Sequence, residues 1–291
     1  MKRKVYEQLL EWKSQEHHKP LILNGVRQCG KTYVLKEFGR QEFDSLAYVS
    51  CDRNVNLQAI YSGDFDVARI IQGLSALTGV DIIPGKTLIF LDEVQAFPQA
   101  LEALKYFCED APEYHIVVAG SLLGVALHAG VSFPVGKVQT LRLFPMDFEE
   151  FLMAMGEEQL LKLMHSHDYE LMNAFHEKLK DLLRQYYYVG GMPEVVKAFA
   201  ENKLLNQVRS LQNEILSNYA SDFSKYAPSQ EVPRIDMVWQ SILGQLSKEN
   251  KKFVYGVLKK GGRAKEFELA IQWLVDAGLV YKITKVSKPE L

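Results

Sequence analysis

The feature that most constrains the fold of this chain is the segment 25–32, which has the pattern G-x-x-x-x-G-K-[ST]. It directly follows the apolar run 21–23, and a helix-forming segment, 33–38, comes after it. Glycine at positions 25 and 30 allows positive φ angles and a close approach to an anion, so that successive backbone N–H groups can surround it. A strand before the pattern and a helix after it are the context that such a loop requires. We therefore predict a phosphate-binding loop rather than a glycine turn that ends in Lys-Thr by chance.

The residue types in this loop predict a nucleoside triphosphate, ATP, as the ligand. Lys31 would bridge the β- and γ-phosphates and Thr32 would ligate Mg²⁺. The helix over residues 32–38 would direct the positive end of its dipole at the triphosphate. The residues that we expect to contact the nucleotide are Gly25, Val26, Arg27, Gln28, Cys29, Gly30, Lys31, Thr32 and Tyr33.

A second segment, 87–93, is an apolar strand that ends in the carboxylates Asp92 and Glu93. A buried strand of this kind can deliver acidic groups to a metal-bound nucleotide. Asp92 would support Mg²⁺, directly or through water, and Glu93 would orient and deprotonate the attacking water. The alternative is a solvated acidic turn. We prefer the metal site because the loop and the acidic strand together specify it, and the presence of Glu93 favours hydrolysis over phosphate transfer to another acceptor.

Three further strands complete the predicted sheet. They lie at 46–51, at 115–121 and at 136–143, so that five strands alternate with helices. Such alternation predicts a parallel α/β sheet with the ligand at the carboxyl ends of the strands. Ser121 would lie at one of these ends as a sensor of the nucleotide, although a Gly-Ser turn that caps the next helix fits the same residues.

Composition excludes several classes of protein. The chain has 291 residues, 47% hydrophobic and 24% charged, with a formal net charge of −2, which is ordinary for a globular protein of two or three domains. Three widely spaced cysteines argue against a disulfide framework and favour a reducing compartment. No apolar run is long enough to cross a membrane, and the N-terminal segment is expected to be an amphipathic helix rather than a signal sequence. We therefore expect a cytoplasmic protein with no membrane partner.

The chain divides into three predicted parts. Residues 1–145 would form an α/β core, residues 146–227 a helical lid, and residues 234–291 a winged-helix domain with its third helix at 264–277 and a strand at 279–286. We expect Pro228 and Pro233 to bracket a linker between the last two parts.

The segment 248–265 carries seven basic residues against one acidic residue, Glu249. Such a run could contact a nucleic-acid backbone without sequence preference. We prefer the alternative that it is a solvated face, because charged runs are more often solvated than bound. The helix at 264–277 has one basic residue, Lys265, and three acidic ones, so we do not expect it to read DNA sequence.

Several ordered blocks resemble the prokaryotic AAA-type ATPases that are catalogued as AAA domain, type fourteen. The blocks are 25–32, 91–95, 119–123, 143–146 with 148–152, 189–194 and 273–280. The resemblance implies a P-loop ATPase core followed by helical and winged-helix regions. It also implies a further nuclease-like C-terminal domain, labelled domain of unknown function 4143, which we expect this chain to lack.

The function predicted from these observations is Mg²⁺-dependent ATP hydrolysis, with Glu93, Lys31 and Ser121 as catalytic residues and Thr32 and Asp92 as metal ligands. The alternative is a slow nucleotide-gated module that regulates a protein partner or associates with DNA. No arginine finger can be assigned, although Arg142, after the last strand, is preferred as a completing charge. A neighbouring subunit could supply that charge, so a homo-oligomer is compatible with the sequence.

Overall fold

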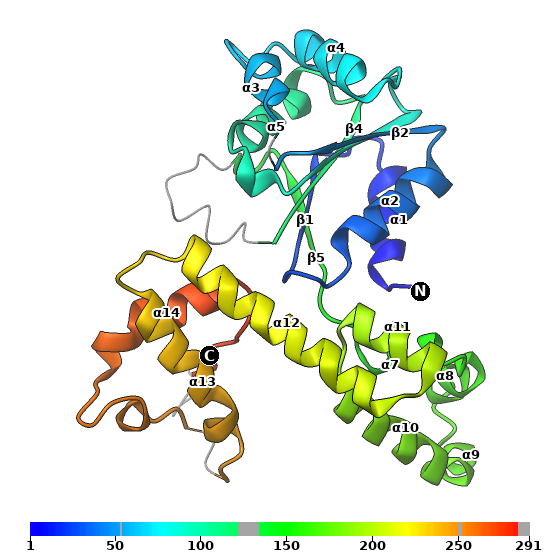
Figure 1. The fold of residues 1–291 in the computed structure, drawn as a ribbon. Helices are drawn as coiled ribbons and strands as arrows, with labels where there is room; N and C mark the ends of the chain where they lie inside the picture. The colour runs from blue at the N-terminus through cyan, green and yellow to red at the C-terminus, as the bar shows by residue number, and fades with distance from the viewer. Residues whose placement is uncertain (53, 122–133, 250–251, 285–291) are drawn as a thin grey trace, which may run out of the picture. The chain divides into compact units, whose positions relative to one another are not determined.

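The computed structural model of the chain describes residues 1–52, 54–121, 134–249 and 252–284. It contains two compact units, Met1–Gln212 and Asn213–Leu291, which are described separately below. Figure 1 shows the helices and strands of both.

A five-stranded parallel sheet forms the centre of the first unit, as predicted. Its spatial order is β2-β3-β4-β1-β5, so β4 separates β1 from β3. Every residue of β3 and β4 is buried, which explains why their sequences are continuous apolar runs rather than alternating ones. The strands are β1 (Leu21–Asn24), β2 (Ser45–Ser50), β3 (Thr87–Asp92), β4 (His115–Gly120) and β5 (Gln139–Arg142).

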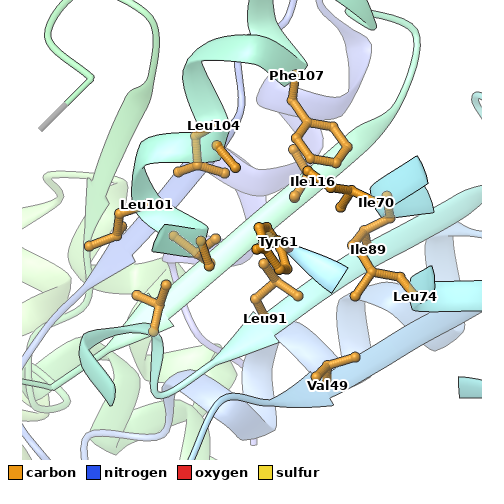
Figure 2. Packing of buried hydrophobic residues seen from close by; sticks show 14 of the residues in the cluster. Val49, Tyr61, Ile70, Leu74, Ile89, Leu91, Leu101, Leu104, Phe107 and Ile116 are labelled. Atoms are coloured by element: carbon orange, nitrogen blue, oxygen red, sulfur yellow. The ribbon is translucent and has the colours of Figure 1, made fainter. Parts of the chain in front are cut away.

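Helices cover both faces of this sheet. Ile89 and Leu91 of β3 point to one side, where they pack in the cluster drawn in Figure 2 with Leu104 and Phe107. Leu88 and Phe90 pack on the other side, as expected from the alternation of side chains along a strand. The first face is covered by α3 (Asn56–Ile60), α4 (Val67–Thr78), the 3₁₀ turn η1 (Val94–Ala96) and α5 (Gln99–Asp110), and the second by α1 (Val5–Ser14) and α2 (Lys31–Glu42).

The chain after β5 is helical, and short helices replace the longer segments that the sequence pattern suggested. The apolar spacing over 147–165 and 169–188 corresponds to two helices in each segment. Gly156, with φ of 79°, separates the first pair in a conformation that suits glycine. The helices are α7 (Phe148–Ala154), α8 (Glu158–His165), α9 (Tyr169–Ala174), α10 (His176–Val189) and α11 (Pro193–Asn202). The predicted domain boundaries at 145 and 227 are not tested by this division and stay predictions.

The second unit is built from helices around three aromatic side chains. Phe223 meets Trp239 and Trp273 edge-on, with ring centroids 5.5 Å apart in each pair. The elements are α12 (Leu205–Tyr226), which begins in the first unit, α13 (Val232–Leu246), the 3₁₀ turn η2 (Tyr255–Val257) and α14 (Ala264–Asp276). The predicted linker between Pro228 and Pro233 is wrong at its second end, because Pro233 lies in the first turn of α13, where its missing N–H costs no hydrogen bond.

The winged-helix assignment is not confirmed. Residues 279–284 form no strand, and the N–H groups of Leu279 and Val280 instead donate to the Leu274 carbonyl oxygen at 3.0 and 3.4 Å. The expected strand at 279–286 is therefore wrong over these residues, and 285–286 lie outside the described part of the chain. Among the described residues, no helix combines the length and apolar character needed to cross a membrane.

Candidate functional site

The predicted phosphate loop lies between β1 and α2. The Gly25 N–H donates to Oδ1 of Asn24 at 2.7 Å, and a methyl group added at Gly25 would lie 2.2 Å from the Leu143 carbonyl oxygen. Gly30, directly before α2, has a φ of 95°, which strains any residue with a Cβ. Both glycines are therefore required by the backbone itself, one by close packing and the other by its conformation.

Lys31 lies within the loop as a buried cation. The residue is 6% exposed, and its Nζ donates to the carbonyl oxygens of Gly25 and Val26, at 2.8 Å each. Burial lowers the pKa of this ammonium below its usual value, because desolvation disfavours the charged form. An anion placed beside the ammonium would favour the charged form again, so the site is suited to a phosphate.

The other loop residues differ in exposure. Cys29 is fully buried, its Sγ lies 3.6 Å from the Leu143 carbonyl oxygen, and burial raises the pKa of its thiol. Gln28 has a positive φ of 64°, and its Oε1 is buried without a hydrogen-bond partner among the described residues. Arg27 and Tyr33 are exposed, whereas Val26 and Thr32 are half-buried.

Asp92 is a buried carboxylate at the end of β3, with 4% of the residue exposed. Its Oδ1 accepts the N–H of Glu93 at 3.0 Å, and its Oδ2 accepts the hydroxyl of Tyr48 at 3.3 Å. Burial, with the nearby negative charge of Asp92, raises the pKa of Tyr48 to about 12, so the hydroxyl stays a donor. Tyr48 is not predicted from the sequence, because a single tyrosine in an apolar strand carries no signal of its partner.

Glu93 adopts the left-handed conformation, with φ of 52°, which is uncommon for a residue with a side chain. One of its carboxylate oxygens, Oε2, accepts a hydrogen bond from Nε2 of Gln95. Strained backbone of this kind often occurs where a side chain must be aimed, so the conformation marks Glu93 as a functional candidate.

The strand order places the candidate residues along one edge of the sheet. The strands are parallel, so the ends of β1, β3 and β4 meet at that edge, with β4 in the middle. Ser121, 7% exposed, follows Gly120, which pairs with Asn24 at the start of the loop. Whether Ser121 also caps a helix concerns residues 122–133, which lie outside the described residues.

Arg142 ends β5 on the other side of β1, where it also pairs with Asn24. Its guanidinium carbon lies 5.4 Å from the ring centroid of Phe144, and the residue is exposed. The structure thus places this residue beside the loop strand and leaves its proposed role as a completing charge untested.

The oxygen donors at this edge fit Mg²⁺. The Thr32 hydroxyl and the Asp92 carboxylate are hard oxygen ligands, and Mg²⁺ is usually held by one or two carboxylates together with substrate phosphates. The Asp92 carboxylate is also fixed in orientation by Tyr48 and the Glu93 N–H. These two residues are thus suitable ligands, although their role as such stays a prediction.

The basic segment 248–265 belongs to the second unit, and Lys251 within it lies outside the described residues. Lys259 pairs with Glu266 of α14 at 2.6 Å. On α14 itself, Nε2 of Gln272 donates to Asp276 at 2.8 Å. Part of the positive charge is therefore engaged within the unit, and contact with nucleic acid stays a prediction.

Comparisons with known proteins agree with this geometry. Residues 17–152 match the family model described as AAA domain, and residues 180–291 match a domain of unknown function, DUF8612. A comparison with curated proteins finds no relative.

Three solved structures match the chain at low sequence identity, and the first of them shares its fold. The Walker-type ATPase PABY2304 of Pyrococcus abyssi matches at a TM-score of 0.59 and 14% identity, over 95% of this chain and 89% of that one. A Drosophila ORC structure bound to DNA matches at a TM-score of 0.42 and 13% identity, over 97% of this chain and 81% of that one. The replication initiator DnaA, bound to AMPPCP and single-stranded DNA, matches at a TM-score of 0.38 and 15% identity, over 94% of this chain and 85% of that one.

The family match covers the phosphate loop, the acidic strand and the whole parallel sheet, and the first of these structures shares the fold. Residues 17–152 are therefore an AAA domain of the kind found in AAA-type ATPases.

Proposed function

We propose that the chain binds ATP together with Mg²⁺ at the loop of residues 25–33 and hydrolyses it. The observation that carries the proposal is the convergence of the loop after β1, Ser121 after β4 and the carboxylates at the end of β3 at one edge of a parallel sheet. Ligands of open α/β sheets bind outside the carboxyl ends of the strands.

The loop residues would bind the triphosphate. Lys31 exchanges the carbonyl oxygens of Gly25 and Val26 for oxygens of the β- and γ-phosphates, and the N-terminus of α2 adds its dipole. Thr32 and Asp92 would hold Mg²⁺, which neutralises charge on the phosphates when it is bound. Glu93 accepts a proton from the attacking water, and Ser121 senses the γ-phosphate.

Replacement of Glu93 by Gln tests this proposal. Glutamine keeps the size of the side chain but is not a base, so we expect ATP binding to persist while hydrolysis falls strongly. Glu102→Gln on α5 is the matched control, and we expect it to leave turnover unchanged. Binding is measured by titration with a fluorescent ATP analogue, and turnover by release of phosphate. Turnover that survives Glu93→Gln would rule out Glu93 as the base.

A second candidate function is a slow, nucleotide-gated regulatory module. The hydrogen bond from Gln95 to Oε2 of Glu93 favours it, since a base engaged in this way is less available to water. The same assays separate the two functions. An ATP-binding protein with negligible wild-type turnover would support the regulatory module, whereas turnover that depends on Glu93 would support the hydrolase.

A further inference from the structure

Arg3 is a buried cation that joins three distant segments of the first unit. Its Nε donates to Oε1 of Glu150 at 3.1 Å, its Nη1 to the carbonyl oxygen of Cys29 at 2.8 Å, and its Nη2 to that of Phe144 at 2.6 Å. The side chains of Arg3 and Glu150 are only 4% and 6% exposed. Separating such a buried pair would leave an uncompensated charge, so the guanidinium is held firmly in one place.

The contact with Cys29 fixes the orientation of a peptide group within the phosphate loop. In a trans peptide the C=O and the following N–H point in opposite directions, and no described residue has a cis peptide bond. The Cys29 carbonyl faces Arg3, so the Gly30 N–H faces the opposite side of the loop. Because Gly30 has no Cβ, the peptide between Cys29 and Gly30 would otherwise rotate at little steric cost.

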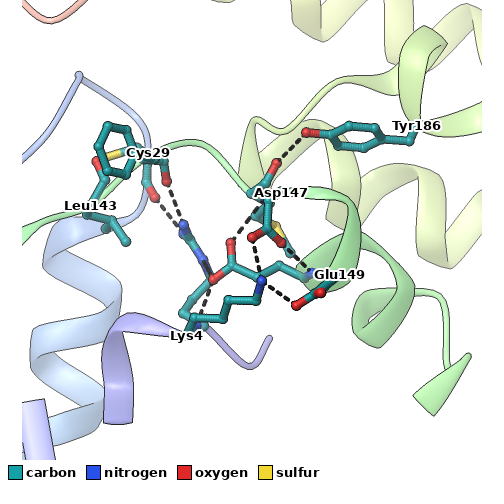
Figure 3. A network of polar contacts seen from close by, with 10 residues as sticks. Lys4, Cys29, Leu143, Asp147, Glu149 and Tyr186 are labelled. Carbon is teal, nitrogen blue, oxygen red and sulfur yellow. Dashed lines mark hydrogen bonds and ion pairs between the residues drawn. The ribbon is translucent and has the colours of Figure 1, made fainter. Parts of the chain in front are cut away.

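The anchor of Arg3 is the first turn of α7. Glu150 is part of a capping box with Asp147, whose Oδ1 accepts the Glu150 N–H at 2.9 Å. The backbone N–H of Lys4 also donates to Oε1 of Glu150, at 2.7 Å, and Nζ of Lys4 pairs with Asp147 at 2.6 Å. Figure 3 shows Lys4, Cys29 and Asp147 within this network. The beginning of the chain therefore links the loop to α7.

We propose that Arg3 is a positioning residue of the nucleotide site, which holds the peptide between Cys29 and Gly30 with the Gly30 N–H turned toward the phosphates. The inference rests on the proposed function, because it takes the ligand of this loop to be a nucleoside triphosphate. Arg3 lies behind the loop and acts through the backbone, and it supplies a coupling between the loop and α7 that no motif in the sequence reveals.

Arg3→Lys is the variant that tests the inference. Arg3→Ala would leave the Glu150 carboxylate buried without its partner and so destabilise the fold. Lysine keeps the positive charge, but its ammonium lacks the planar guanidinium that donates to Glu150, Cys29 and Phe144 at once. We expect Arg3→Lys to bind Mg-ATP about tenfold more weakly, the scale of one lost charge-assisted hydrogen bond. A wild-type affinity in Arg3→Lys would overturn the inference.

Two controls separate positioning from loss of stability. Lys4→Met removes the ion pairs of Lys4 with Asp147 and Glu149 in the same network and leaves Arg3 in place. Leu160→Ala makes a cavity in the cluster with Leu152 and Leu182, which destabilises the same unit away from the loop. Both should bind Mg-ATP with wild-type affinity at a temperature at which all variants are folded. If Leu160→Ala weakens binding as much as Arg3→Lys does, the effect is one of general stability and the inference is wrong.

Amide hydrogen exchange gives a readout that does not depend on nucleotide. We expect residues 25–32 to exchange faster in Arg3→Lys than in wild type, and at the wild-type rate in Lys4→Met. Unchanged exchange in Arg3→Lys would contradict a role in ordering the loop. If the wild-type protein binds no nucleotide, the proposed function fails, and this exchange measurement still decides whether Arg3 orders the loop.

Discussion

Replacement of Lys31 by Met should separate the nucleotide site from the stability of the fold. Methionine keeps most of the buried stem and removes the ammonium. Two hydrogen bonds to the Gly25 and Val26 carbonyl oxygens are lost, at about 1 kcal/mol each, but the cost of burying a charge is lost as well. We therefore expect the free energy of unfolding of the unliganded variant to lie within about 2 kcal/mol of the wild-type value.

The loss of stabilisation by the nucleotide should be larger than this change in the unliganded protein. A ligand at about 100 times its dissociation constant stabilises the wild type by about 2.7 kcal/mol, and a hundredfold loss of affinity at the same concentration leaves about 0.4 kcal/mol. For a domain of about 200 residues, 1 kcal/mol corresponds to about 2–4 °C in Tm. The wild type should therefore shift by roughly 5–11 °C and Lys31→Met by about 1 °C.

The assay is thermal unfolding with and without Mg-ATP, at one fixed nucleotide concentration. Arg40→Met is the matched control, because Arg40 is an exposed cation on the same helix and pairs with Glu37, one turn before it. It should keep the full shift. A shift of wild-type size in Lys31→Met would refute the assignment of this loop as the nucleotide site.

Three further predictions follow from the surroundings of the site and of the sheet. Gly25→Ala should abolish the Mg-ATP thermal shift and leave the circular dichroism unchanged, because the added methyl group would lie 2.2 Å from the Leu143 carbonyl oxygen. A thermal shift retained in Gly25→Ala would contradict this prediction. Iodoacetamide should label the half-buried Cys108 before the buried Cys29, as seen by mass spectrometry, and faster labelling of Cys29 would show that the loop opens. Burial lowers the pKa of His115 from 6.5 to about 4, so between these two pH values the imidazole is protonated in the unfolded chain and neutral in the folded one. The free energy of unfolding, measured in urea, should therefore fall as the pH drops from about 6.5 to 4. An equally steep fall in His115→Gln would show that another group causes it.

The sequence predicted the elements that are buried on both faces better than those at the surface. The strands β3 and β4 were located to within a residue, because the central residues of a fully buried parallel strand form a continuous apolar run. Pro233 was misplaced in a linker because proline occurs both in loops and in the first turn of helices. The strand expected after α14 rested on apolar residues alone, which do not distinguish a strand from an extended segment that packs without pairing.

The candidate site was predictable only where its residues are close together in sequence. The loop and the Asp92–Glu93 pair each form a local pattern, whereas the Tyr48 hydroxyl reaches Asp92 across a strand pairing. Arg3 reaches Glu150 over 147 positions, and in the sequence it is one of three consecutive basic residues near the beginning of the chain. Contacts of this length are set by packing, and no spacing rule describes them.

The strand order adds a constraint that the chain order conceals. Because β4 is inserted between β1 and β3, the loop and the acidic pair are separated by one strand rather than adjacent, about 10 Å apart at a spacing of about 4.8 Å per strand. We propose that a triphosphate held by the loop would extend across that gap, with its terminal phosphate next to the residue at the end of the intervening strand. That residue is Ser121, and its proposed role as a sensor follows from this position in the sheet together with its hydroxyl.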